Sequence, residues 1–268
     1  MPSEKKIIFL NSYSPRTGHN FVSEAIKVFS QHEVLIHNRS ETRLSRMLEA
    51  YYHIYYKSIH HKTDKDFMDH LFIHSLRSRI LEKCDNEYAM IKDTTLIGKD
   101  HLRKLFPEDI HFILLRDPNA VFNSLMKAMK FKKPGFKTMV KKIGMQLGIY
   151  PYYYSRKMSH RILRELPDFS HYEVIKYEDL HQKNLEALER LKTIFQCPKS
   201  MDQLLEEIDA IQVINSSFHE EVAARKIWEA KPKTETFDPI HRKGNSFFIR
   251  LGVRMGTQKL RQKLGYIS

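Results

Sequence analysis

Two short apolar runs, IIFL at residues 7–10 and HFILL at residues 111–115, do not alternate with polar residues. A strand with one face in water alternates in this way, whereas a strand buried on both faces of a parallel sheet is apolar throughout. Such runs recur along the chain and are separated by longer stretches with the apolar spacing of helices. The sequence therefore predicts an α/β fold, a parallel β-sheet flanked by helices.

The expected elements follow one another in a single domain that covers residues 1–268 and ends in a basic tail from residue 245. Neither an internal repeat nor a low-complexity segment interrupts the pattern. Strands are expected at residues 5–12, 33–38, 88–94, 110–117 and 171–177. Helices are expected at residues 19–31, 98–106, 118–131, 183–196 and 200–211, as two or more within 40–84, and over 135–166 with a break near Pro151.

Charge is distributed unevenly along the chain, whose net charge is +13. No acidic residue occurs between Asp117 and Glu165 or after Asp238, and both intervals are rich in lysine and arginine. Such fields favour anionic ligands: nucleotides, nucleic acid, acidic glycans or an anionic membrane face. A basic surface that serves only solubility is the alternative.

The expected location is the cytoplasm. The two cysteines, Cys84 and Cys197, are too few for a disulfide framework or a zinc site, which fits a reducing compartment. The sequence contains no run of about 18 apolar residues, so no membrane-spanning helix is expected. The opening MPSEKKIIFL reaches strand-like sequence at once, so no signal peptide is expected.

The loop SPRTGHN, residues 14–20, joins the first expected strand to its helix. Backbone N–H groups at a helix start bind phosphate oxygens, helped by the helix dipole. Gly18 permits close approach of the backbone, and Arg16 adds a fixed positive charge. A Walker loop would need a lysine followed by serine or threonine to hold phosphate and magnesium, and this pair is missing.

A second polar cluster follows the fourth expected strand, where Arg116 precedes Asp117 and Pro118. Proline is favoured in the first turn of a helix, so a helix begins here. Ser124 lies about two turns into that helix and is expected to face back toward the strand end. Arg116 and Ser124 together are candidates to hold a second phosphate, which indicates a nucleotide phosphorylated at both ends.

These two clusters resemble the sulfotransferases that use 3′-phosphoadenosine 5′-phosphosulfate (PAPS). In that family a P-[KR]-[ST]-G loop binds the 5′-phosphosulfate, and an arginine followed eight residues later by a serine binds the 3′-phosphate. PRTG and the pair Arg116 and Ser124 match both in the right order. The resemblance implies a P-loop-kinase-like sulfotransferase fold and assigns donor contacts to Arg16, Thr17, Gly18, His19, Asn20 and Phe21.

Three further segments are similar to family motifs. KYEDL at 176–180 assigns an adenine contact to Tyr177, and SSF at 216–218 assigns adenine-flanking roles to Ser217 and Phe218. RKG at 242–244 resembles the late loop that closes over the 3′-phosphate and adds Arg242, Lys243 and Gly244. The chain departs from the family pattern after the loop glycine, where His19 and Asn20 replace the usual hydroxyl residues. Phe21 stands where many members have a tryptophan that stacks on adenine, so it is either a stacking ring or an ordinary core residue.

The resemblance implies a sulfuryl transfer from PAPS to a hydroxyl or amine of an acceptor, with adenosine 3′,5′-bisphosphate as product. The loose transition state needs cations near the leaving phosphate, and the resemblance gives this role to Arg16 and Lys92. The family's usual catalytic histidine would fall at Thr94. Asp93 is therefore the preferred general base, with His19 and Glu41 as alternatives.

No metal is expected, because the sequence offers no acidic pair with ligand spacing and the adjacent His60 and His61 read as surface residues. The acceptor is expected to contain carbohydrate or to be anionic, and nucleic acid is not an expected partner. The apolar and cationic tail of residues 247–267 is expected either to rest on an anionic membrane or to pack against the domain, its glycines weakening a continuous helix. Two other functions stay open: a nucleotide or small-molecule kinase of related fold, and a non-catalytic binder of anionic ligands.

Overall fold

The computed structural model describes residues 5–35, 41–129, 135–211, 213–222, 225–231 and 245–268, and it describes side chains only outside 212–244. Contacts within the chain define two compact units. The sheet unit comprises Met1–Ser12, Gly18–Leu114 and Pro167–Pro232. The helical unit comprises Tyr13–Thr17, Leu115–Leu166 and Lys233–Ser268.

The sheet unit is built on five strands in the order β2-β3-β1-β4-β5. Their bounds are β1 Lys6–Ser12, β2 Glu33–Val34, β3 Tyr88–Asp93, β4 Ile110–Leu115 and β5 Glu173–Lys176. Strand β1 pairs in parallel with both β3 and β4, and β2 pairs in parallel with β3. The predicted parallel sheet is thus confirmed, and each predicted strand is present, although only two residues of the second are described as strand.

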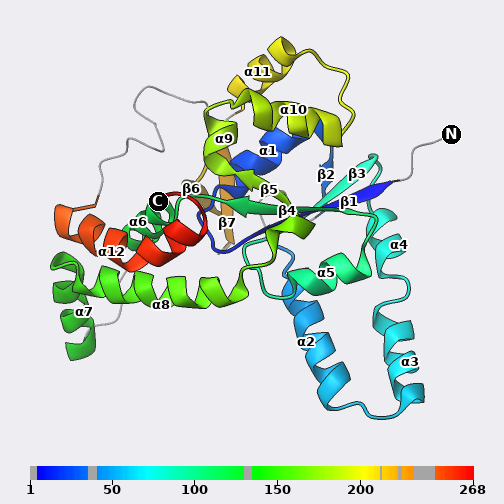
Figure 1. The fold of residues 1–268 in the computed structure, drawn as a ribbon, viewed down its shortest axis with the longest axis horizontal. Helices are drawn as coiled ribbons and strands as arrows, with labels where there is room; N and C mark the ends of the chain where they lie inside the picture. The colour runs from blue at the N-terminus through cyan, green and yellow to red at the C-terminus, as the bar shows by residue number, and fades with distance from the viewer. Residues whose placement is uncertain (1–4, 36–40, 130–134, 212, 223–224, 232–244) are drawn as a thin grey trace. The chain divides into compact units, whose positions relative to one another are not determined.

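Helices cover both faces of this sheet (Figure 1), as the continuous apolar runs require. The helix bounds are α1 His19–Ser30, α2 Leu44–Lys57, α3 Lys62–Phe72, α4 Leu76–Leu81, α5 Lys99–Leu105, α9 Tyr177–His181, α10 Leu185–Ile194 and α11 Met201–Asp209. In β1, Ile8 and Leu10 join the core formed with helices α1, α9, α10 and α11, whereas Ile7 and Phe9 join the core formed with α2 and α5.

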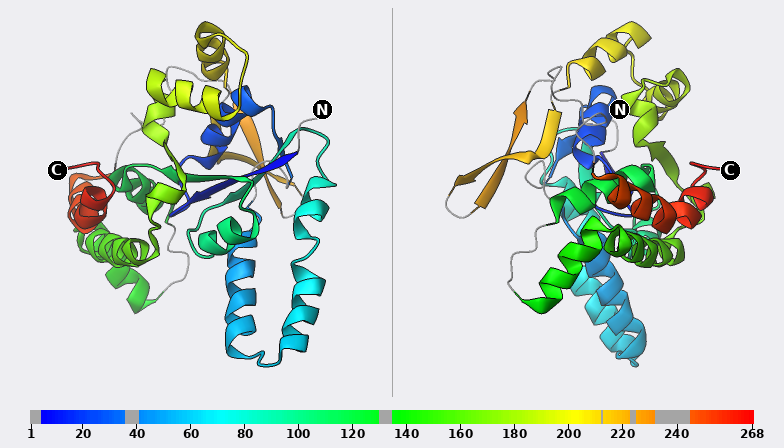
Figure 2. Two further views of the ribbon diagram at one scale, coloured as in Figure 1. Left: turned by 45° about the vertical axis from the view of Figure 1, so that its right-hand side comes forward. Right: turned by 90° about the vertical axis from the view of Figure 1, so that its left-hand side faces the viewer.

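Helices α2 and α3 form a hairpin that extends from the sheet (Figure 2). Its aromatic residues pack mainly on one another, and Tyr51 and Tyr55 donate hydrogen bonds of 2.7 and 2.9 Å to the carboxylate of Asp69. The predicted helices within residues 40–84 are confirmed. An antiparallel pair that the sequence analysis did not predict, β6 Val213–Val222 and β7 Arg225–Lys231, follows α11.

The helical unit contains four helices among its described residues, α6 Pro118–Ala128, α7 Phe136–Gln146, α8 Ile149–Glu165 and α12 Phe247–Lys263. The predicted helix over 135–166 is broken near Pro151 as expected, and the break falls at Gly148, which has a φ of 75°. Pro151 lies in the first turn of α8, where its missing N–H leaves no hydrogen bond unmade.

The C-terminal tail forms one continuous helix, contrary to the expectation that its glycines weaken it. A Cβ on Gly252 would lie 2.2 Å from the carbonyl oxygen of Gly148, and a Cβ on Gly256 would lie 2.6 Å from that of Tyr152. These glycines therefore allow α12 to approach α8 closely. The packing gained by close contact offsets the intrinsic cost of glycine in a helix, about 1 kcal/mol each.

Candidate functional site

The strand order indicates a ligand site at the carboxyl ends of the strands. From β1 the chain runs first to β2 and β3 on one side and then to β4 on the other side. In open α/β sheets, ligands bind outside the carboxyl ends of the strands where the order reverses in this way. The segments that follow β1, β3, β4 and β5 begin with Tyr13, Thr94, Arg116 and Tyr177. Four of the predicted residues, Arg16, Lys92, Arg116 and Tyr177, therefore lie in or next to these segments.

The loop between β1 and α1 has an unusual backbone. Arg16 has a φ of 73° and Gly18 has a φ of 97°, so left-handed residues stand on both sides of Thr17. A non-glycine residue rarely adopts this conformation, and such strain concentrates at functional sites. The Thr17 hydroxyl is buried and donates a hydrogen bond of 3.1 Å to the carbonyl of Ser14. Turns of this kind, leading directly into a helix, orient backbone N–H groups toward an anion.

Gly18 and Tyr177, which the sequence analysis assigned to opposite ends of the donor, are neighbours in the sheet unit. A Cβ on Gly18 would lie 2.3 Å from Cδ2 and 2.6 Å from Cε2 of the Tyr177 ring. Phe21 meets the same ring edge-on, with centroids 5.5 Å apart, and His181 stacks on it at 5.7 Å. Two predicted adenine contacts, Phe21 and Tyr177, are thus brought together. The sequence analysis did not include His181 in this cluster. Its spacing of four residues from Tyr177 in a helix could have indicated that the two side chains are neighbours.

Lys92 and His19 lie within the sheet unit beside the end of β3. The Lys92 side chain is almost completely buried, at the β3 position paired with Leu10 of β1. Burial and the nearby charge of Lys92 lower the pKa of His19 to about 4, so this imidazole is neutral near pH 7. His19 makes hydrogen bonds to the carbonyl of Leu10 at 3.3 Å and the hydroxyl of Ser12 at 3.5 Å. These contacts give His19 a role in joining α1 to β1.

Asp93, the preferred general base, is buried, and its carboxylate accepts four hydrogen bonds. Oδ1 accepts from the N–H of Arg43 at 2.5 Å and from the hydroxyl of Thr42 at 3.3 Å. Oδ2 accepts from the N–H and the hydroxyl of Ser45 at 3.0 and 2.8 Å. A carboxylate offers about four acceptor positions, so Asp93 is saturated by the start of α2. This arrangement favours a positioning role over proton abstraction, because a capping carboxylate stabilises the helix N-terminus.

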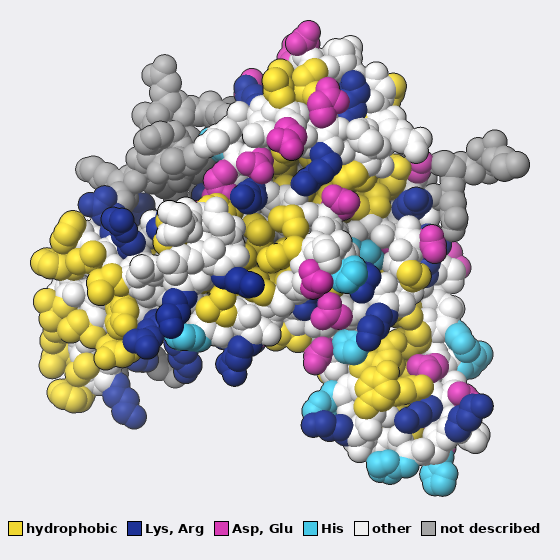
Figure 3. Space-filling view, in the orientation of Figure 1, with side chains coloured by type: hydrophobic (Ala, Val, Ile, Leu, Met, Phe, Trp, Pro, Cys, Tyr) yellow, Lys and Arg dark blue, Asp and Glu magenta, His cyan; other side chains and the backbone are white. Residues whose placement is uncertain are grey.

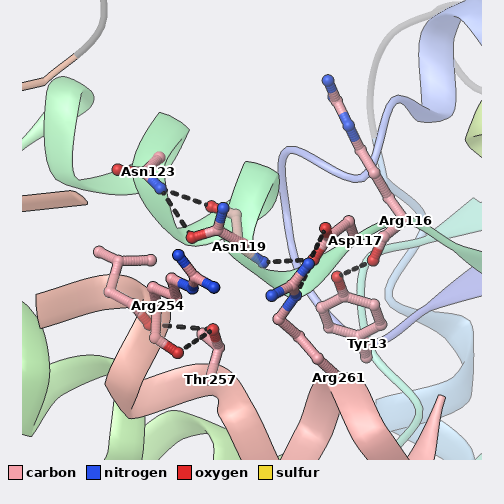
Figure 4. Close-up of polar contacts among 9 residues, drawn as sticks. Tyr13, Arg116, Asp117, Asn119, Asn123, Arg254, Thr257 and Arg261 are labelled. Carbon is pink, nitrogen blue, oxygen red and sulfur yellow. Dashed lines mark hydrogen bonds and ion pairs between the residues drawn. The ribbon is translucent and has the colours of Figure 1, made fainter. Parts of the chain in front are cut away.

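In the helical unit, Arg116 contacts the loop that contains Arg16. The Arg116 guanidinium donates a hydrogen bond of 3.1 Å to the carbonyl of Arg16. The Tyr13 hydroxyl donates one of 2.6 Å to the carbonyl of Arg116 (Figure 4). The two arginines that the sequence analysis named as phosphate ligands are therefore neighbours. A guanidinium on this carbonyl also holds Arg16 in its strained conformation.

Asp117 and Arg261 form a bidentate ion pair that the sequence analysis missed (Figure 4). The carboxylate accepts from Nε at 2.8 Å and from Nη2 at 2.9 Å, and it also caps α6 by accepting from the N–H of Asn119 at 2.8 Å. The Arg116 side chain points away from this pair. The cap was readable from Asp117 preceding Pro118, but no local signal relates Asp117 to an arginine 144 residues away.

The remaining predicted residues fall into two groups. Asn20 and Ser124 are partly exposed, in the first turn of α1 and in α6. Ser217 and Phe218 lie in β6, whose side chains are outside the described residues, as are Arg242, Lys243 and Gly244. Their predicted roles stay predictions. Within the described part of the chain, no group of three or more histidine, cysteine or acidic residues is arranged to hold a metal ion, and no helix is long and apolar enough to cross a membrane.

No protein-family model matches this chain, and no curated protein matches it in sequence. Its fold is similar to that of solved sulfotransferase domains. For the domain from the curacin biosynthetic pathway, the TM-score is 0.49 at 17% identity, with 99% of each chain covered. For the domain of the Synechococcus PCC 7002 olefin synthase, the TM-score is 0.44 at 13% identity, over 99% of this chain and 97% of that one. At these identities and TM-scores the likeness concerns the fold alone.

Proposed function

We propose that this protein is a PAPS-dependent sulfotransferase. The observation that carries the proposal is the hydrogen bond from Arg116 to the backbone of Arg16, two residues 100 positions apart in sequence. It links the loop that resembles a 5′-phosphosulfate site to the arginine that resembles a 3′-phosphate ligand. The left-handed backbone at Arg16 and Gly18, followed at once by the start of α1, supports an anion site in the same loop.

The donor contacts of this proposal come from both sequence and packing. The loop from Arg16 to Asn20 would bind the 5′-phosphosulfate, and Arg116 with Ser124 would bind the 3′-phosphate. Phe21, which is partly exposed and packs edge-on against the buried Tyr177 ring, would stack on adenine. Without a lysine followed by serine or threonine in the loop, an ordinary magnesium–nucleotide site is disfavoured, which weighs against the kinase alternative.

The chemistry needs positioning and cations more than covalent catalysis. The bond from sulfur to the bridging phosphate oxygen breaks as the acceptor oxygen or nitrogen bonds to sulfur. Adenosine 3′,5′-bisphosphate leaves with the electron pair, and the proton of the acceptor passes to water. Negative charge grows on the phosphate oxygen, where Arg16 and Lys92 would neutralise it. Asp93 would act indirectly by fixing the start of α2, so the proton acceptor is not assigned to it.

The acceptor is proposed to be a carbohydrate-containing or anionic molecule. The exposed lysines and arginines of the acid-free interval between Asp117 and Glu165, with the tyrosines of α8, suit such a ligand electrostatically and by stacking. A screen of labelled PAPS with glycans, glycolipids and simple alcohols would identify the class.

Calorimetric titration of adenosine 3′,5′-bisphosphate, against ADP and ATP with and without magnesium, tests the donor site. The proposal predicts metal-independent binding of the bisphosphate and weaker binding of the other two nucleotides. Arg116→Ala should weaken bisphosphate binding by roughly tenfold or more, as expected for a lost charge-assisted contact. Arg79→Ala, which removes an exposed arginine of α4, should leave it unchanged.

Turnover separates an enzyme from a binding protein. Arg16→Ala and Lys92→Ala should lower turnover by roughly 100-fold or more while the bisphosphate still binds, because these cations act mainly on the transition state. A preference for magnesium–ATP would instead support a kinase. Bisphosphate binding without turnover on any acceptor would support the non-catalytic binder.

A further inference from the structure

Helix α7 carries an apolar face that is exposed. Phe136, Met139, Val140 and Ile143 have the spacing of one helix face, and each side chain is between 48% and 76% exposed. Leu147, directly after the helix, continues the same row at 56% exposed. A face of this kind is normally buried against a partner, so its exposure in the described structure indicates a binding surface.

Helices α8 and α12 continue this surface. In α12 the exposed apolar residues lie on one side, while Gly252 and Gly256 face α8. The starts of the two helices are adjacent, since a Cβ on Gly148 would lie 2.2 Å from the carbonyl oxygen of Phe248. Gly144 in α7 similarly lies against Tyr150 of α8. The apolar face consists of Phe136, Met139, Val140, Ile143, Leu147, Ile149, Tyr153, Phe247, Phe248, Leu251 and Met255.

Figure 3 shows this apolar face as a continuous yellow area bordered by lysine and arginine. Lys137, Lys141 and Lys142 each directly precede or follow an apolar residue of the α7 row, and a rotation of about 100° per residue places such neighbours away from the centre of the apolar face, toward its flanks. No acidic residue occurs in α7, in α12, or in α8 before Glu165. The exposed cations on these helices include Lys137, Lys141, Lys142, Arg156, Lys157, Arg250, Arg254 and Lys259.

We infer that this apolar face docks the protein on the surface of an anionic lipid bilayer. Apolar side chains that enter the boundary between headgroups and acyl chains, with lysine and arginine at headgroup level, are how interfacial helices bind membranes. A second copy of the chain would bring an equally cationic border against this one, and the like charges would repel. An anionic bilayer complements both the apolar centre and the cationic border.

The inference does not depend on the donor site, and it adds a location to the proposed reaction. Its test is flotation of the full chain with vesicles of phosphatidylcholine alone and of phosphatidylcholine mixed with phosphatidylserine. The wild-type protein should float with the anionic vesicles, remain behind with the neutral ones, and bind less as salt is raised.

Single substitutions in the apolar face give the decisive comparison. Val140→Glu and Leu251→Glu should each reduce vesicle binding by roughly tenfold or more, because each removes an inserted apolar group and adds a negative charge. Leu185→Glu is the matched control, since Leu185 of α10 is 58% exposed but lies in the sheet unit. It should bind vesicles as the wild type does.

Lys141→Ala and Lys142→Ala provide a second test that leaves the apolar side chains intact. Each should weaken binding to anionic vesicles by roughly fivefold. Equal binding to neutral vesicles, or no flotation with either kind, would overturn the inference. So would a wild-type dimer in solution that Val140→Glu converts to monomer, because that result would make a second copy the partner of this face.

Discussion

Replacing Gly18 with alanine tests whether the loop and the Tyr177 ring form one rigid arrangement. Two costs add at this position. The φ of 97° is in the left-handed region, where a Cβ costs about 1–2 kcal/mol. The added Cβ would also lie 2.3 Å from the Tyr177 ring, which must move within a packed core, and overpacking of this kind costs about 1–3 kcal/mol.

Gly265 separates these two terms. It has a φ of 72°, but nothing lies within 4 Å of a Cβ built on it, so Gly265→Ala carries only the backbone cost. Gly18→Ala should therefore lower the free energy of unfolding by roughly 2–5 kcal/mol, against about 1–2 kcal/mol for Gly265→Ala. Urea unfolding followed by circular dichroism measures both.

A double-mutant cycle tests whether the greater loss of stability in Gly18→Ala comes from its contact with the Tyr177 ring. Tyr177→Ala in the Gly18→Ala background removes the overlap, so the two substitutions together should cost less than the sum of their separate effects, by about 1 kcal/mol or more. Titration with adenosine 3′,5′-bisphosphate should show weaker binding for Gly18→Ala and unchanged binding for Gly265→Ala. If the two glycine variants lose equal stability and the cycle is additive, the contact between Gly18 and Tyr177 has no energetic role.

The remaining predictions concern the buried polar groups of the sheet unit. Asp93→Asn should cost roughly 2–4 kcal/mol of unfolding free energy, because buried donors at the start of α2 lose acceptors, whereas the exposed Asp85→Asn should cost nothing measurable. Unchanged stability with abolished turnover would restore Asp93 as general base. Burial and nearby lysine charge lower the pKa of His19 to about 4 and that of His32 to about 3. Stability should therefore be complete above pH 6.5 and fall toward pH 4, by roughly 3 kcal/mol from His19 alone. Urea unfolding across this range should show a shallower pH slope in His19→Gln and an unaltered one in the exposed His53→Gln.

The sequence alone predicted the parallel sheet and the position of the candidate residues along it. Continuous apolar runs such as residues 7–10 require burial on both faces, and burial on both faces is a property of the strand itself. Glycine and proline marked the loop at residues 14–20 and the start of α6 for equally local reasons. Local backbone preferences and strand ends are encoded by neighbouring residues, so they can be read without a structure.

Tertiary structure alone decided which of these groups meet. Whether Asp93 abstracts a proton or caps α2 depends on residues about 50 positions away, and the ion pair of Asp117 with Arg261 joins groups 144 positions apart. The apolar residues of α7 have the spacing of an amphipathic helix, which normally buries its apolar face, yet in the structure that face is exposed. Periodicity specifies which side of a helix is apolar, but only the packing of the other helices determines whether that side is covered, and by what.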